Sequence, residues 1–203
     1  MKNELTKEFL DRIQLMIANN DAIAIEKELQ ELHPSDIADL LESLGSEEAF
    51  FVFDLIDDEI SSDVLIEFDE DYRQKFIKKL SPQIIADQIE NLESDDAADI
   101  LGELDDEEKD EIISQLDDKE HADEITDLLK YDEDTAGGLM HKEFFQARAN
   151  WRVNQCVFEL RKQTKDVDRV FNIYVVDEND ILLGILSLKS LLFATETTLI
   201  EEI

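Results

Sequence analysis

Carboxylates are the side chains of this sequence with the clearest chemical potential, because they are crowded into one stretch. Residues 81–135 hold 22 Asp and Glu side chains and only 3 Lys or Arg. Within this stretch, Asp95 and Asp99 stand four residues apart, which places them on one face of a helix as a like-charge pair that a bound cation would stabilise. Hard oxygen ligands of this kind select Mg²⁺ or Ca²⁺. The alternative is a solvated acidic face that binds no ion.

An enzyme active site is not indicated. Acid/base catalysis by carboxylates needs a pair that converges in a cleft, and the sequence singles out no such pair. The histidines His33, His121 and His141 lie far apart, without a nucleophile motif, a phosphate-binding loop or a paired-histidine helix. Cys156 is the single cysteine, so neither an intramolecular disulfide nor a cysteine metal site can form. We therefore expect a protein that is not an enzyme.

The net charge limits the partners. The 203 residues carry 53 acidic and 19 basic side chains, a formal charge of −34. Such a surface repels nucleic acid and anionic lipid, and it attracts cations. The hydrophobic share of 43% is too high for a disordered acidic tail, and the sequence contains no apolar run long enough to cross a bilayer. We expect a folded protein that binds cations and not nucleic acid.

The charge is distributed unevenly along the chain, which indicates two domains of different kinds. Up to Asp134 the chain has 43 acidic and 11 basic residues, whereas the remainder has 10 and 8. The Gly137-Gly138 pair predicts a turn near this change in composition. We therefore predict a helical domain of residues 1–130, a junction of residues 131–139 and a second domain of residues 140–203.

An apolar residue recurs every twelve positions through the first domain. Because twelve residues are not a whole number of turns, this column would rotate by about 120° per repeat around one unbroken helix. The helix must therefore break once per repeat. A second column follows nine residues behind the first, and all seventeen positions are apolar. The first column is Leu32, Leu44, Ile56, Phe68, Leu80, Leu92, Leu104, Leu116 and Leu128, and the second is Leu41, Phe53, Leu65, Ile77, Ile89, Leu101, Ile113 and Ile125.

Helix-capping residues stand at the predicted breaks. Ser81-Pro82 is typical of an N-cap followed by proline at the first helical position. Helices of about nine residues are marginal alone, so neighbours must stack to bury both columns. Residues 21–130 are thus predicted to form an α-solenoid-like array, right- or left-handed, and an irregular helical bundle is the alternative. Aspartates occupy the same capping column at Asp57, Asp69, Asp105 and Asp117.

After the junction the pattern becomes that of a βαββα unit. Residues 144–147 predict a short strand, and apolar side chains at i, i+3, i+4 and i+7 from Val153 predict a helix. Residues 172–177 and 182–187 predict two strands joined by a turn, and Ser187 predicts the N-cap of a last helix. A unit of about sixty residues has a small core and should need a partner. We expect the chain to be truncated just as a further segment begins.

Three sequence motifs resemble the cytosolic region of MgtE magnesium transporters. They are residues 32–41 (LHPSDIADLL), residues 131–140 (YDEDTAGGLM), and the strand pair 173–177 (IYVVD) and 184–188 (GILSL). The resemblance covers nearly the whole chain, and the junction motif is its most specific part. The βαββα unit alone resembles a CBS motif, which occurs in many regulated proteins.

The resemblance implies a Mg²⁺-sensing regulatory region on the cytoplasmic side of the cell membrane. In this family the helical domain and a tandem CBS pair bind Mg²⁺ and close a membrane pore. The expected partners are a second copy, bound through the CBS motifs, and the transmembrane domain of the same polypeptide. By motif position the Mg²⁺ ligands are the carboxylates of Asp39, Asp95 and Asp99 and the backbone of Gly138. Carboxylates of a second CBS motif, beyond Ile203, would complete these sites.

Two further expectations concern ligands and function class. CBS modules that bind adenine nucleotides commonly carry Asp three residues after the Ser that opens the last helix. Here Ser187 is followed three residues later by Ser190, which does not support nucleotide binding. The alternative function is a helical-repeat protein-interaction scaffold, similar to flagellar motor switch proteins. A titration with divalent cations separates the two, since only a sensor should compact specifically.

Overall fold

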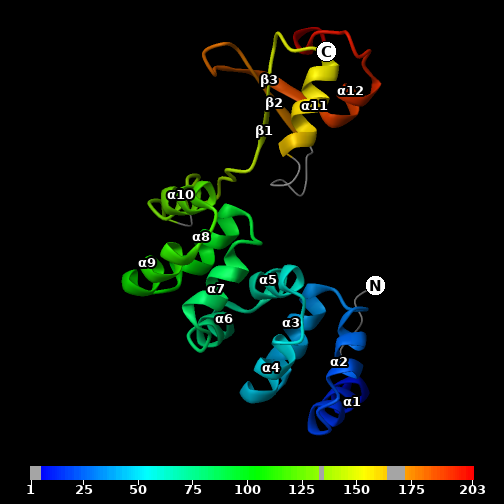
Figure 1. Ribbon diagram of the computed structural model, residues 1–203, viewed down its shortest axis with the longest axis vertical. Helices are drawn as coiled ribbons and strands as arrows, with labels where there is room; N and C mark the ends of the chain where they lie inside the picture. Colours follow the sequence, from blue (N-terminus) through cyan, green and yellow to red (C-terminus); the bar gives the residue numbers. More distant parts are fainter. Residues whose placement is uncertain (1–5, 133–134, 164–171) are drawn as a thin grey trace. The chain divides into compact units, whose positions relative to one another are not determined.

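The computed structural model describes residues 6–132, 135–163 and 172–203, and it divides into two units, Met1–Met140 and His141–Ile203 (Figure 1). Within the described residues, the first unit holds short helices and the second a three-stranded sheet with helices. This order confirms the predicted fold class, a helical array followed by a βαββα unit. The array consists of α1 (Lys7–Ala18), α2 (Ala22–Leu29), α3 (Pro34–Ser43), α4 (Ser46–Phe53), α5 (Asp58–Glu67), α6 (Glu70–Ile77), α7 (Pro82–Ile89), α8 (Ser94–Gly102), α9 (Asp106–Gln115) and α10 (Lys119–Leu128).

Helix starts follow the twelve-residue spacing from α3 to α9. The side chains of Asp57 and Asp69 each accept the backbone N–H two residues ahead, and those of Ser81 and Asp105 accept the N–H three residues ahead. These bonds satisfy donors that a helix leaves without a partner in its first turn. The predicted helix breaks at these positions are confirmed. The successive N-caps are His33, Gly45, Asp57, Asp69, Ser81, Glu93 and Asp105.

The predicted cap at Asp117 is wrong by one residue. Helix α10 has Asp118 as its N-cap, and the carboxylate of Asp118 accepts from the N–H groups of Glu120 and His121. The N–H of Asp117 instead donates to the carboxylate of Glu90 at the C-terminal end of α7. Helix α10 therefore begins one position later than the twelve-residue spacing predicts.

Both apolar columns line a single core. Of the seventeen column positions, thirteen are buried and the other four are partly buried and packed against the same core. Helices two apart in sequence pack on one another, α3 on α5, α5 on α7, α7 on α9 and α8 on α10. The structural unit that repeats is therefore a helix pair of twice the sequence period. The partly buried positions are Leu32, Ile56, Leu80 and Ile113.

Carboxylates also join one helix pair to the next. Glu42, near the end of α3, accepts the N–H of the α6 cap Asp69 at 2.8 Å. Glu90 accepts the N–H groups of Asp117 and Asp118 in the same way. Glu90 lies 48 residues after Glu42, and Asp117 lies 48 residues after Asp69. Such bonds satisfy backbone donors at helix starts, where the helix dipole also favours negative charge.

A largely buried ion pair fixes the end of α8. Glu103 is the C-cap of α8, and its carboxylate accepts from Nε and Nη2 of Arg73 on α6. The same guanidinium donates to the carbonyl of Ile66 at 3.0 Å, so it spans three segments. This arrangement holds the last turn of α8 in place.

The second unit is a mixed sheet with the order β1-β2-β3. Strand β1 (Phe145–Arg148) runs parallel to β2 (Asn172–Val176), which is antiparallel to β3 (Leu182–Ser187). Helix α11 (Val153–Gln163) follows β1, α12 (Leu188–Phe193) follows β3, and a 3₁₀ turn (Ile200–Glu202) ends the unit. In the β2–β3 turn, hydrogen bonds from the N–H groups of Ile181 and Asn179 lower the pKa of Asp177.

The two faces of this sheet differ. Phe145, Ile173 and Leu186 face a core that α11 and α12 complete, and both helices lie on that side of the sheet (Figure 1). On the opposite face Ile185 is 62% exposed, and Phe144 meets Tyr174 edge to face. The described helices of this unit therefore seal one face of the sheet and leave the other open. None of the helices in the described ranges is both long and apolar enough to cross a membrane.

Candidate metal site

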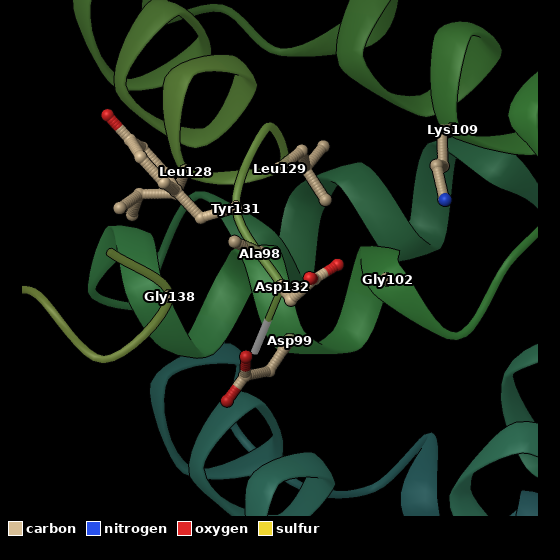
Figure 2. Close-up of a pocket in the computed structure, with 9 residues that line it drawn as sticks. All are labelled: Ala98, Asp99, Gly102, Lys109, Leu128, Leu129, Tyr131, Asp132 and Gly138. Atoms are coloured by element: carbon tan, nitrogen blue, oxygen red, sulfur yellow. The ribbon is translucent and has the colours of Figure 1, made fainter. Parts of the chain in front are cut away.

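Helix α8 and the junction enclose a pocket of about 350 Å³ inside the first unit (Figure 2). Both walls come from segments that the sequence analysis had singled out, the acidic helix and the glycine-containing junction. The pocket brings carboxylates and a backbone of junction residues to one place. Its lining consists of Ala98, Asp99 and Gly102 of α8, Lys109 of α9, Leu128 and Leu129 at the end of α10, and Tyr131, Asp132 and Gly138.

The packing of α8 exposes one side of the helix to the pocket. Ala98 and Leu101 are buried in the core, so the residues that follow each of them in sequence, Asp99 and Gly102, lie on the outer side. A Cβ atom at Gly102 would meet nothing within 4 Å among the described residues. The glycine therefore leaves open space on this side of α8.

Thr135 holds the junction in a compact turn. Its backbone N–H and its hydroxyl both donate to the carbonyl of Asp132, at 2.9 and 2.7 Å. The same hydroxyl accepts the N–H of Gly138 at 3.3 Å, and the Thr135 carbonyl accepts the N–H of Leu139. These bonds fix the backbone at Asp132 and Gly138, both of which line the pocket.

Gly137 is needed for space and not for a left-handed backbone. None of the glycines in the described segments has a positive φ angle. A Cβ atom at Gly137 would lie 2.3 Å from Cδ1 of Tyr131, closer than any side chain could tolerate. The expected junction turn is present, but its glycine serves a close approach of backbone to an aromatic ring.

The pocket offers hard oxygen ligands together with one ammonium group. Figure 2 shows the Asp132 carboxylate directed toward Gly102 and the side of Lys109, whereas the Asp99 carboxylate points the other way. Carboxylate and carbonyl oxygens from Asp99, Asp132 and Gly138 suit Mg²⁺, which retains several of its waters and takes few protein ligands. The donor set therefore fits a hydrated divalent cation.

Of the four predicted ligands, two line the pocket and two do not. Asp99 and Gly138 come together at the pocket, whereas Asp95 lies one turn earlier on α8 and does not line it. Asp39 is exposed on α3, a helix that packs against α5. The sequence analysis missed Lys109 and did not propose Asp132 as a ligand. A lysine within so acidic a stretch was the available signal for Lys109.

The fold defines a class of protein with an acidic array of short helices followed by a βαββα unit, and a pocket with carboxylates in its lining lies at the end of the array. Residues 32–134 match the family model described as the MgtE intracellular N domain. That match spans just over half of the 203 residues, so the chain belongs to the MgtE family. The resemblance inferred from the sequence motifs is confirmed.

Two named relatives are both magnesium transporters. The MgtE of Thermus thermophilus is 32% identical over 193 residues, which are 94% of this chain and 43% of that protein. The MgtE of Enterococcus faecalis is 37% identical over 84 residues, which are 41% of this chain and 18% of that protein. This chain therefore spans less than half the length of either relative.

Two solved structures are similar over nearly the whole chain. The soluble part of a magnesium transporter superposes with a TM-score of 0.81 at 26% identity, covering 97% of this chain and 77% of that one. The cytosolic domain of the Mg²⁺ channel MgtE in complex with ATP gives a TM-score of 0.87 at 30% identity, covering 95% and 79%. These relatives are named for magnesium transport and not for an enzymatic activity.

Proposed function

We propose that this chain is the Mg²⁺-sensing regulatory region of a magnesium transporter, on the cytosolic side of the membrane. The observation that carries the proposal is the junction pocket, where the Asp99 and Asp132 carboxylates line the same space as Gly138. The names of the relatives supply the transported ion. Asp39 and Asp95 are proposed as ligands of further ions, since neither lines this pocket.

The gating mechanism follows from charge. Acidic surfaces that must approach one another repel when divalent cations are scarce, and a bound Mg²⁺ bridges them. Asp99 and the Gly138 carbonyl hold one side of such a bridge, and carboxylates beyond Ile203 supply the other. Because Mg²⁺ binds the bridged state more tightly, its occupancy shifts the population toward that state and closes the pore.

The experiment is a proteolysis titration on the complete transporter. Mg²⁺ should protect the junction, residues 131–139, from protease. Asp99→Ala should raise the Mg²⁺ concentration for half-protection about three- to tenfold, because a ligand is lost. Asp95→Ala combined with Asp99→Ala should raise it further.

The matched control is Asp63→Ala, which removes the same charge from an exposed position on α5. It should change the midpoint less than about twofold. Protection of the double variant at lower Mg²⁺ than the wild type would mean that repulsion dominates and that Asp95 and Asp99 form a solvated face. A helical-repeat scaffold would show no Mg²⁺-specific protection in any variant.

A homodimer through the βαββα units completes the proposal. Its support is the unsealed sheet face around Ile185 together with Phe193, which is 84% exposed on α12. Apolar surface of this kind marks an interaction site in a unit with so small a core. Adenine nucleotide is not included, because Ser190 stands at the expected Asp position and its hydroxyl hydrogen-bonds that of Ser187 at 3.0 Å.

A further inference from the structure

Lys109 is the cationic side chain in the wall of the junction pocket. It lines the same space as Asp99 and Asp132, and its side chain is only 23% exposed. Residues 81–135 contain just two other basic side chains, Lys119 and Lys130. A lysine whose side chain is so little exposed, in the wall of an acidic pocket, calls for a physical explanation.

The ion pair of Lys109 outside the pocket does not explain its position. Its Nζ lies 3.7 Å from Oδ1 of Asp106, three residues earlier on α9, and the Asp106 side chain is fully exposed. An exposed pair at that distance contributes little, because water and salt screen it. The further carboxylates available to Lys109 are those that line the same pocket.

The pocket gives Lys109 room to move. Gly102 forms the floor between Lys109 and the Asp132 carboxylate, and it carries no side chain to block the way (Figure 2). A lysine has a flexible stem of four carbons and a compact charge. Its ammonium can therefore approach the pocket carboxylates when no ion is bound, and withdraw toward Asp106 and solvent when one enters.

We propose that Lys109 is a built-in competitor for the cation at this site. Without Mg²⁺ its ammonium moves toward the carboxylate of Asp132, which is directed to its side of the pocket, and Mg²⁺ must displace it in order to bind. Lys109 thus lowers the affinity of the site and sets the Mg²⁺ concentration at which it responds. This inference rests on the function proposed above, and it adds an affinity-determining residue that is not itself a ligand.

The test is an NMR titration of the 203-residue chain with MgCl₂ at constant ionic strength, following the backbone amides of Gly102, Asp132 and Gly138. Lys109→Met keeps the length of the stem and removes the charge. It should lower the Mg²⁺ concentration at half-response about three- to tenfold, since one positive charge beside a divalent ion is lost. Lys109→Arg retains the charge and should respond within about twofold of the wild type.

Lys130→Met is the matched control. It makes the same change in net charge within the same acidic stretch, but Lys130 is 65% exposed, pairs with Asp127 and does not line the pocket. Its midpoint should move less than about twofold. Equal shifts for Lys109→Met and Lys130→Met would reduce the effect to general electrostatics and overturn the proposal.

The outcomes separate this inference from the proposed function. If the wild-type amides respond to Mg²⁺ and Lys109→Met does not change the midpoint, Lys109 is no competitor, yet the metal site stands. If the pocket amides respond in neither protein, the residues of this chain hold no Mg²⁺ for Lys109 to compete with and this inference falls, whereas the bridged site of the complete transporter is decided by its protease protection. Contacts between the Lys109 ε-methylene and Gly102, measured by NOE without metal and weakened by Mg²⁺, would add direct support.

Discussion

Tyr131 and Gly137 make a contact that leaves no room for a Cβ atom. We expect Gly137→Ala to destabilise the first unit by about 1–3 kcal/mol, because the ring must move or the turn must open. Thermal unfolding followed by circular dichroism would measure the loss. The change should also disturb the pocket, because Tyr131 and Gly138 both line it.

A second glycine provides the control. Gly102→Ala adds the same methyl group in open space on a helix, so it should leave stability unchanged or raise it by at most about 1 kcal/mol. Adding Tyr131→Ala to Gly137→Ala should recover part of the lost stability. Equal effects of the two glycine substitutions would show that the ring contact does not constrain the junction.

Cys156 reports on the second unit. Cys156 lies on α11 and is fully buried in the core of this unit, and burial raises the pKa of its thiol to about 11. At pH 8 only about one thiol in a thousand is then ionised, so an aromatic disulfide reagent should label the folded chain very slowly. Labelling should become fast in denaturant. Rapid labelling of the native chain at pH 8 would contradict the packing of α11 on the sheet.

At the scale of the helices, the core positions are not equivalent. Ile89 is completely buried, whereas Leu80 is only partly buried against the core. We expect Ile89→Ala to cost about 3–4 kcal/mol and Leu80→Ala about 1–2 kcal/mol, since less apolar surface is lost at Leu80. Urea unfolding of both variants measures the difference. Equal midpoints would mean that the two columns are buried alike.

The sequence predicted the helix breaks because capping chemistry is local. Asp57, Asp69, Ser81 and Asp105 each satisfy backbone donors within their own first turn. At Asp117 the spacing is wrong by one residue, because the neighbouring Asp118 offers the same capping chemistry and takes the N-cap position. The packing of alternate helices also escaped prediction, since both columns are apolar in every repeat and do not distinguish odd from even helices.

In the candidate metal site, too, residues in local motifs could be predicted, whereas contacts between segments distant in sequence could not. The predicted ligands Asp99 and Gly138 lie in recognisable motifs and do meet at the pocket. Lys109 belongs to no motif, and its place depends on how α9 lies beside α8 and the end of α10. Pattern and spacing can suggest a ligand, but they do not show which neighbouring charge opposes it.

At the scale of the whole molecule, the two units should differ in their response to dilution. The array has its own continuous core, whereas the βαββα unit leaves Ile185 and Phe193 in water. If the units pair as proposed, labelling of Cys156 should accelerate as the protein is diluted, and Ile185→Lys should give the fast rate at every concentration. Leu15→Lys is the control, an exposed apolar residue on α1 of the array.

Sedimentation provides the independent measurement. The wild type should change from dimer to monomer over the same range of concentration, and Leu15→Lys should behave like the wild type. A monomer at all concentrations, with labelling that does not depend on dilution, would remove the dimer from the proposal.

The stacking of alternate helices limits how the length of the array can change. From α3 to α9 the odd-numbered helices contact one another, and α8 contacts α10, so in this part of the array a helix keeps these neighbours only if its odd or even position is preserved. Deleting residues 57–80 would remove the whole α5–α6 pair with its caps, so every later helix would keep its odd or even position in the array. Deleting a single twelve-residue repeat would exchange the roles of all later helices. Insertions and losses during evolution should therefore come in whole pairs.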